Sequence, residues 1–246
     1  MSMIGKLVLI TGGGTGTGAD LARGFARAGA SVIIAGRRAE PLAMVAKGYE
    51  GIRAIPADVT DEASVAALFE AAGPVDIVIA NAGAAVSAPL HRTSLADFQA
   101  MLAVNLTGVF LTFRAGLAQM GPGGRLIAVA SVAGLKGMAY TSAYTAAKHG
   151  VVGLVRSVAL EVAKKGITAN AICPGFIDTD MTERTLETIM AKTGRSRDEA
   201  LATLCATNPQ GRLIRPDEIT ATALWLASDG ADGVNGQAIA LTGGEA

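Results

Sequence analysis

The sequence predicts an α/β protein: a doubly wound parallel sheet of about seven strands with helices on both faces. Short aliphatic runs alternate with longer segments whose apolar residues recur at spacings of three and four. Strand–helix–strand units of this kind connect by right-handed crossovers, which makes neighbouring strands parallel. No Pro/Ser-rich linker and no change of composition divides the 246 residues. We therefore expect residues 1–246 to form a single domain.

The expected strands are nearly uninterrupted apolar runs, as required where helices cover both faces of a sheet. In chain order they are Leu7–Ile10, Val32–Ala35, Ile52–Ile55, Val75–Ala80, Leu126–Ala130, Ile167–Ile172 and Ala238–Leu241. The expected helices have helical apolar spacing and comprise Ala19–Ala28, Ala63–Ala72, Leu95–Gln119, Ala143–Lys164 and Pro216–Ser228. This alternation favours a parallel sheet over an antiparallel one.

One segment interrupts the alternation. Residues 178–212 follow the sixth expected strand and carry many charged side chains and several threonines. A long polar insertion at the carboxyl end of a strand is a typical position for a lid over a ligand. The alternative is a pair of solvated helices without a binding role. We expect 178–212 to be a substrate-side lid.

Composition excludes several classes of protein. Lysine and arginine total 21, as do aspartate and glutamate, and this net charge of zero argues against a nucleic-acid partner. No uncharged apolar run reaches the roughly 18 residues of a membrane span, and Met1–Lys6 does not begin a signal peptide. The two cysteines, Cys173 and Cys205, lie in no metal-binding cluster. These features predict a cytoplasmic protein with no metal and no membrane contact.

A glycine-rich turn follows the first expected strand and begins the first helix. The segment reads Thr11-Gly-Gly-Gly-Thr-Gly-Thr-Gly18. Glycines let backbone N–H groups approach a pyrophosphate at the positive end of a helix. The alternative is a tight connection without a ligand. The position of the turn after strand one favours a Rossmann-type dinucleotide site, with the candidate residues Gly12, Thr15, Gly16, Thr17 and Gly18.

The second expected strand ends in Gly36-Arg37-Arg38. Enzymes that select NAD commonly place an acidic residue here for the ribose 2′-hydroxyl, whereas an arginine accommodates the 2′-phosphate of NADP. The acid is absent, and Arg37 and Arg38 offer two guanidinium groups. The alternative is a pair of solvated arginines. NADP(H) is favoured, and NAD(H) remains possible.

Polar and small residues also follow the third and fourth expected strands. Asp58 and Val59 come after the third, and Asn81 and Gly83 after the fourth. Each could be ordinary turn chemistry, because Asp, Asn and Gly favour turns for their own reasons. The carboxyl ends of adjacent parallel strands, however, open into one crevice. We therefore expect these residues to contact the adenine and ribose of a dinucleotide.

Three residues form a candidate proton-transfer group. Ser131 ends the fifth expected strand, and Tyr144 and Lys148 lie four residues apart, on one face of the next helix. A nearby ammonium favours the phenolate, so Lys148 is expected to lower the pKa of Tyr144 from its ordinary value of about 10. Ser131 could then donate to a carbonyl oxygen placed between it and Tyr144. The alternative for a bare Tyr-x-x-x-Lys is an exposed packed pair.

The whole pattern resembles the short-chain dehydrogenase/reductase family. Thr-Gly-x-x-x-Gly-x-Gly, Asn81-Ala-Gly, Ser131, Tyr144-x-x-x-Lys148 and Pro174-Gly175 occur in order, and the resemblance extends from Lys6 to Gly244. It implies that Tyr144 is the acid/base, that Ser131 orients the carbonyl and that Lys148 holds the nicotinamide ribose. It further implies a proton-relay role for Asn105, contacts to the nicotinamide end from Pro174, Gly175, Ile177 and Thr179, and a homotetramer.

The expected activity is hydride transfer between NADP(H) and a small-molecule ketone or secondary alcohol. The segments Lys148–Gly153 and Asn170–Gly175 resemble those of 3-oxoacyl-thioester reductases, polyketide ketoreductases and 3-hydroxybutyrate dehydrogenases. A 3-oxoacyl-type substrate is therefore favoured. An alternative is an NAD-dependent dehydrogenase of a cyclic or aliphatic secondary alcohol. A different kind of alternative is a non-catalytic nucleotide sensor on the same fold, since fold alone does not establish function.

Overall fold

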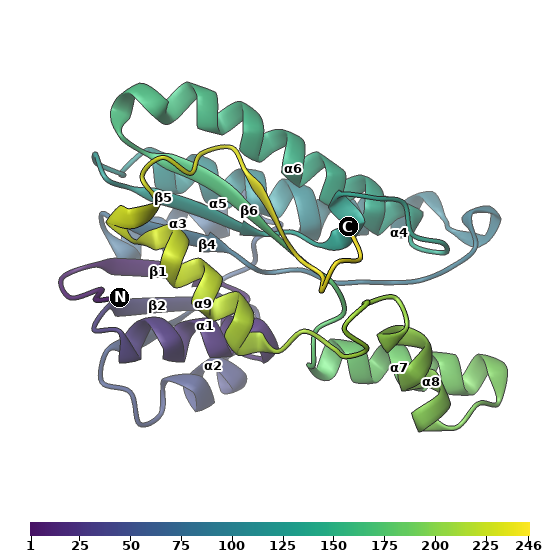
Figure 1. Ribbon diagram of the computed structural model, residues 1–246. Helices are drawn as coiled ribbons and strands as arrows, with labels where there is room; N and C mark the ends of the chain where they lie inside the picture. Colours follow the sequence, from purple (N-terminus) through teal and green to yellow (C-terminus); the bar gives the residue numbers. More distant parts are fainter.

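A seven-stranded parallel sheet forms the centre of the protein (Figure 1). The computed structural model describes residues 1–246. The strands are β1 Leu7–Thr11, β2 Ser31–Gly36, β3 Ile52–Pro56, β4 Ile77–Ala80, β5 Arg125–Val129, β6 Thr168–Pro174 and β7 Ala238–Leu241. Their spatial order is β3-β2-β1-β4-β5-β6-β7, and every pair is parallel. The order reverses between β1 and β4, which opens a crevice at their carboxyl ends.

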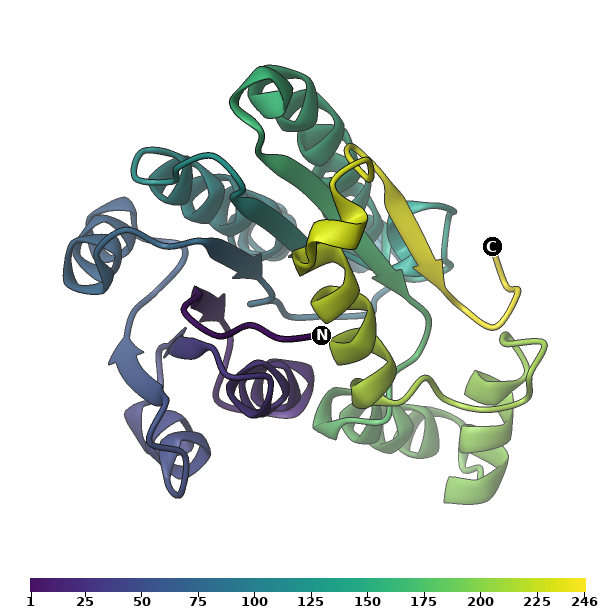
Figure 2. The ribbon, with the colours of Figure 1, turned by 60° about the vertical axis from the view of Figure 1, so that its left-hand side comes forward.

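Helices cover both faces of the sheet, as predicted (Figure 2). They are α1 Gly16–Arg27, α2 Ala39–Ala46, α3 Glu62–Ala72, α4 Leu95–Leu102, α5 Gly108–Leu117, α6 Ser142–Val162, α7 Asp180–Thr193, α8 Arg197–Cys205 and α9 Pro216–Ala227. Successive strand residues point to opposite faces. Ile33 thus belongs to the core beneath α3, α5 and α6, whereas Ile34 belongs to the core beneath α1, α2 and α9.

The expected helix Leu95–Gln119 is not a single regular α-helix. A π-helical turn, Ala103–Thr107, separates α4 from α5. From Leu95 to Leu117 the combined helix is long and apolar enough to cross a membrane by length and composition alone. Here it covers the sheet, and Val109 and Phe113 lie in the core, so it is a core helix of this domain.

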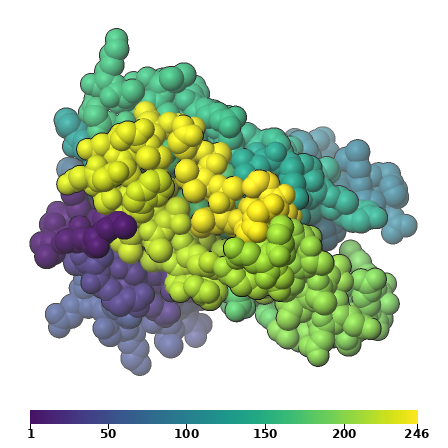
Figure 3. All heavy atoms as spheres, viewed as in Figure 1, coloured from purple at the N-terminus to yellow at the C-terminus, as the bar shows by residue number.

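The segment that follows β6 forms a small lobe of its own. Helices α7 and α8 project beyond the carboxyl end of the sheet, and the space-filling view shows them standing out from the surface (Figures 1 and 3). Their buried contacts are mainly with each other, through Leu186, Ala200 and Leu204. The lobe therefore packs little against the main core.

Candidate active site

The glycine turn has a backbone that side chains would obstruct. Gly12 and Gly16 have φ angles of +69° and +50°, a region that favours glycine. A Cβ at Gly18 would lie 2.1 Å from the carbonyl oxygen of Gly12. Thr15 precedes α1 and is exposed, while Thr17 is buried. The turn thus presents backbone and the first N–H groups of α1 to the crevice, an arrangement suited to a pyrophosphate.

Asn81 supports this turn from the neighbouring strand. Its side-chain amide donates to the carbonyl oxygens of Thr11 (3.0 Å) and Gly12 (3.3 Å). In return, the hydroxyl oxygen of Thr11 accepts from the backbone N–H groups of Asn81 (3.1 Å) and Ala82 (3.2 Å). The side-chain amide of Asn81 therefore holds the glycine turn, and the predicted contact of this segment with a ribose stays a prediction.

The ends of β2 and β3 bring charge to the same edge. Arg37 and Arg38 are exposed. Asp58 accepts hydrogen bonds from the backbone N–H (2.9 Å) and the hydroxyl (2.8 Å) of Thr60. These two bonds lower the pKa of Asp58, and the positive charge of Arg37 adds a smaller effect in the same direction. Val59 is buried against α5, where a Cβ on Gly108 would lie 2.8 Å from it.

Ser131, Tyr144 and Lys148 come together at the carboxyl end of β5. The Ser131 hydroxyl oxygen accepts the N–H of Ala133 at 3.1 Å, which leaves the hydroxyl hydrogen free to donate. Lys148 is 3% exposed. Its Nζ donates to the carbonyl oxygen of Val129 at 2.9 Å and lies 5.6 Å from the centre of the Tyr144 ring. The predicted spacing on one helix face is confirmed.

Burial is the largest influence on the pKa values of Tyr144, Lys148 and the neighbouring Cys173. It raises the pKa of Tyr144, against a smaller lowering by the hydrogen bond from Ser131. It also lowers the pKa of Lys148 to about 8 and raises that of the adjacent Cys173 thiol to about 11. The expectation that Lys148 lowers the Tyr144 pKa is therefore wrong for this structure. The reason is that the ammonium is directed to the Val129 carbonyl while the phenol is desolvated.

Gly83 and Asn105 complete the surroundings of Lys148. A Cβ on Gly83 would lie 2.8 Å from Oδ1 of Asn105 and 3.8 Å from Nζ of Lys148. Asn105 is fully buried in the π-helical turn. Its side-chain amide donates to the carbonyl oxygens of Ala84 (2.9 Å) and Met101 (3.1 Å) and accepts the Ala84 N–H (3.3 Å). The Asn105 side chain thus holds the loop after β4 close to Lys148.

The segment after β6 reaches back to the glycine turn. Pro174 ends β6, and the N–H of Gly175 donates to the carbonyl of Leu241 at 3.0 Å. Ile177 forms a parallel bridge with Ile214. A Cβ on Gly16 would lie 3.3 Å from the methyl group of Thr179. The predicted nicotinamide-end residues therefore lie across the crevice from the start of α1.

Comparison with known proteins decides the family. A model of the short chain dehydrogenase family matches residues 6–189. The chain belongs to this family.

Characterised short-chain dehydrogenases resemble it over nearly their whole length. The cis-4-hydroxycyclohexanecarboxylate dehydrogenase of Sinomonas cyclohexanicum is 39% identical over 97% of this chain and 96% of its own. The D-beta-hydroxybutyrate dehydrogenase of Cupriavidus necator is 36% identical over 98% of this chain and 97% of its own. A crystal structure of actinorhodin polyketide ketoreductase with NADPH superposes with a TM-score of 0.89 at 32% identity, covering 98% of this chain and 97% of that one.

These matches establish the reaction class. The protein is an NAD(P)-dependent short-chain dehydrogenase/reductase, an oxidoreductase of ketones and alcohols. A non-catalytic nucleotide sensor, the alternative that the fold alone leaves open, is therefore not supported.

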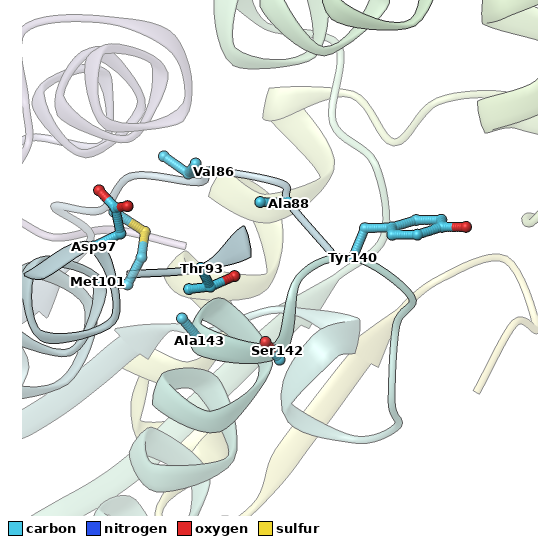
Figure 4. Close-up of a pocket in the computed structure, with 8 residues that line it drawn as sticks. All are labelled: Val86, Ala88, Thr93, Asp97, Met101, Tyr140, Ser142 and Ala143. Atoms are coloured by element: carbon cyan, nitrogen blue, oxygen red, sulfur yellow. The ribbon is translucent and has the colours of Figure 1, made fainter. Parts of the chain in front are cut away.

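This short-chain dehydrogenase also has a strained residue that the sequence did not indicate. Tyr140, one helical turn before Tyr144, is the one non-glycine residue with positive φ, at 64°. Its carbonyl oxygen accepts the N–H of Ala88 at 2.8 Å, and its ring is directed away from the other residues of the small pocket that they share (Figure 4). That pocket is lined by Val86, Ala88, Thr93, Asp97, Met101, Tyr140, Ser142 and Ala143. Tyrosine is uncommon in this conformation, so sequence offers no signal for it.

Proposed function

We propose that this dehydrogenase transfers hydride between NADP(H) and a ketone or secondary alcohol, with a 3-oxoacyl-type compound as the favoured substrate. The observation that carries the proposal is the grouping of Ser131, Tyr144 and Lys148 at the end of β5, on the same edge as the glycine turn. That edge places a proton donor and a dinucleotide cradle on one crevice.

Each side chain has a distinct part in the proposed reaction. In reduction, Tyr144 gives its phenol proton to the carbonyl oxygen of the substrate. Ser131 donates a hydrogen bond from its hydroxyl to the same substrate oxygen and so stabilises the charge that develops there. Lys148, whose Nζ would lie 3.8 Å from a Cβ on Gly83, holds the ribose hydroxyls of the cofactor. Asn105 keeps the loop around Gly83 in place.

The residues of the crevice fit a phosphorylated dinucleotide. Side chains are absent where Gly12 and Gly18 approach neighbouring backbone and where Gly16 approaches the Thr179 side chain, and α1 begins there. Arg37 and Arg38 are exposed, and the position before them at the end of β2 is Gly36 and not an acidic residue. When bound, the nicotinamide supplies or accepts the hydride.

Cofactor preference tests the proposal directly. Dissociation constants of NADPH and NADH, measured by fluorescence titration, should differ by about ten- to hundredfold in favour of NADPH, because charge-assisted hydrogen bonds are worth ~1.5–3 kcal/mol each. Gly36→Asp combined with Arg37→Leu should erase or reverse the preference. Arg27→Leu, at the opposite end of α1, is the matched control and should leave it unchanged. Equal affinities in the wild-type protein would contradict NADP selectivity.

A second candidate is an NAD-linked dehydrogenase of a cyclic or aliphatic secondary alcohol. The 39% identity to the cis-4-hydroxycyclohexanecarboxylate dehydrogenase supports it. A panel of cyclic ketones, aliphatic ketones and 3-oxoacyl thioesters, assayed with both cofactors, distinguishes the candidates. The highest kcat/KM with a 3-oxoacyl thioester and NADPH would support the first, and the highest value with a cyclic alcohol and NAD would support the second.

We further propose a lid, a homotetramer and a cytoplasmic location. Helices α7 and α8, within 178–212, pack mainly on each other at the carboxyl edge, which leaves them able to close over a substrate.

Phe110 on α5 and Leu160 on α6 are 42% and 83% exposed, and such apolar side chains favour a subunit contact. Light scattering of the purified protein should give four times the mass of the chain, and a monomer would contradict this.

A further inference from the structure

Ser131 lies just beyond the last hydrogen bond between β5 and β6. The two strands are parallel, and the N–H of Ala130 donates to the carbonyl oxygen of Ile172 at 2.8 Å. The next N–H along the chain, that of Ser131, has no backbone acceptor. It donates instead to the sulfur of Cys173, the residue that follows Ile172 on β6. A side chain of the neighbouring strand therefore holds the N–H of the residue proposed to bind the substrate oxygen.

The other contacts of Ser131 come from its own turn or from the proton donor. Its carbonyl oxygen accepts the N–H of Gly134 at 2.8 Å, and its hydroxyl oxygen accepts the N–H of Ala133 at 3.1 Å. Its side chain is also hydrogen-bonded to Tyr144. Because the turn moves together with Ser131, only the contact with Cys173 ties the Ser131 backbone to another strand. The direction of the Ser131 hydroxyl thus depends on this sulfur.

The Cys173 thiol is suited to a contact and not to a reaction. It is fully buried, in the core that also contains Ala130 and Val151. Burial raises the pKa of the thiol to about 11, and the N–H of Ser131 and the charge of Lys148 lower it by smaller amounts. A thiol that stays protonated at neutral pH is a poor nucleophile. Its sulfur therefore meets Ser131 as a neutral acceptor and places no second anion beside Tyr144.

We propose that Cys173 is a positioning residue, whose sulfur fixes the Ser131 backbone so that the Ser131 hydroxyl is directed to the substrate carbonyl beside Tyr144. This inference rests on the proposed function, because it assumes that Ser131 and Tyr144 act on the substrate. Cys173 itself touches neither substrate nor cofactor and acts only through Ser131. Its replacement should therefore change kcat and leave the binding of NADPH unchanged.

A double-mutant cycle tests the inference, with the ketone of the panel above that has the highest kcat/KM. Cys173→Val removes the acceptor but fills its space. It should lower kcat roughly tenfold, with KM and the dissociation constant of NADPH within about twofold of the wild type. Ser131→Ala should lower kcat by ~10²–10³-fold. In the Ser131→Ala background, Cys173→Val should change kcat by less than about twofold, because the hydroxyl that Cys173 positions is absent.

Two further variants separate positioning from packing. Cys173→Ser keeps an acceptor at the same place and should retain kcat within about threefold of the wild type. Val162→Ala is the matched control, since Val162 is buried in the same core at the far end of α6. It should lower the melting temperature but leave kcat within about twofold of the wild type. If Cys173→Val does not fold, Cys173→Ala completes the same cycle.

Three results would overturn the inference. One is a Cys173→Val variant with the kcat of the wild type. Another is a Cys173→Val effect on kcat that is equally large with and without the Ser131 hydroxyl, as a purely structural role requires. The third is a Cys173→Ser variant that is as slow as Cys173→Val.

Failure of the proposed function is recognised separately. If the wild-type enzyme reduces no ketone, or if Ser131→Ala keeps full activity, the catalytic proposal is wrong. Hydrogen exchange at the Ser131 amide, followed by NMR, then decides whether Cys173 holds this residue. Exchange should be faster in Cys173→Val than in the wild type and in Cys173→Ser. Equal exchange in the three proteins would contradict the inference whatever the activity.

Discussion

The two halves of the crevice are built by different means. At the β1–β3 side, the shape comes from backbone: Gly12, Gly16 and Gly18 occupy positions where a side chain would be strained or would collide. At the β5–β7 side, the proposed chemistry comes from the side chains of Ser131 and Tyr144. The first half suits a cofactor common to many enzymes, and the second can change its substrate through a few residues without a change of fold.

Replacing the proton donor should have the largest effect, and it should be confined to the β5–β7 side. Tyr144→Phe is expected to lower kcat by about 10²–10⁴-fold, because it removes only the group that transfers the proton. The dissociation constant of NADPH should stay within about threefold, since the glycine turn is untouched. Steady-state kinetics and fluorescence titration measure the two quantities. Near-full activity of the variant would refute the catalytic assignment.

A methyl group added to the glycine turn should affect the β1–β3 side of the crevice, where the cofactor is proposed to bind. Gly18→Ala places a Cβ 2.1 Å from the Gly12 oxygen and 2.6 Å from the Asn81 amide nitrogen. We expect it to weaken cofactor binding and to lower the free energy of unfolding by roughly 2–4 kcal/mol, within the range of overpacking and backbone strain.

Gly153→Ala is the matched control for this substitution. A Cβ on Gly153 would meet nothing within 4 Å, and the residue lies inside α6. Alanine should therefore raise stability by about 0.5–1 kcal/mol. Urea unfolding of Gly18→Ala and Gly153→Ala measures the two changes in the free energy of unfolding. Equal changes would show that the glycine turn is less constrained than its geometry indicates.

Lys148 lies where the halves meet, and its burial predicts a pH effect on stability. The fold lowers its pKa from 10.5 to about 8, so between these values the unfolded chain binds more protons than the folded one. Stability relative to Lys148→Met should then rise with pH from 8 to 10.5, by roughly 2–4 kcal/mol in all, and be level below 8. Urea unfolding at several pH values tests this, and parallel curves for the two proteins would contradict it.

The smallest expected effect concerns backbone strain on the substrate side. Positive φ falls on glycines in both halves, and Tyr140 on the substrate side is the one other residue that adopts it. A non-glycine residue in this conformation costs about 1–2 kcal/mol, and the Tyr140 ring is 67% exposed and loses few contacts. Tyr140→Gly should therefore melt a few degrees above Tyr140→Ala, which keeps the strain. Identical melting temperatures, measured by calorimetry, would show that the strain is negligible.

Much of the fold could be predicted because periodicity reports burial directly. The apolar runs coincide with the strands to within a few residues, and helical spacing located α1, α3, α6 and α9. Helix α2 was not predicted because it buries only Leu42 and Val45, too few residues to establish a period. The π-helical turn around Asn105 was not predicted either, since such turns are rare and occur as single turns inside α-helices.

In the candidate site, the sequence could predict those groupings whose residues lie close together along the chain. Tyr144 and Lys148 are one helical turn apart, and the glycines all lie within Thr11–Gly18, so both groupings follow from chain order. The direction in which the Tyr144 pKa shifts could not be predicted, because the shift depends on desolvation by neighbours that are distant in the sequence.

By itself, the sequence determined the parallel α/β architecture, the position of the glycine turn and the spacing of Tyr144 and Lys148, the residues proposed to act in proton transfer. Only the tertiary structure decided that Lys148 is directed to Val129 and that Asn81 supports the glycine turn. The physical reason is the separation along the chain of the residues that interact. Helix and strand periods are set by neighbours within a few residues. The burial and the hydrogen-bond partners of a side chain depend on segments that only folding brings together.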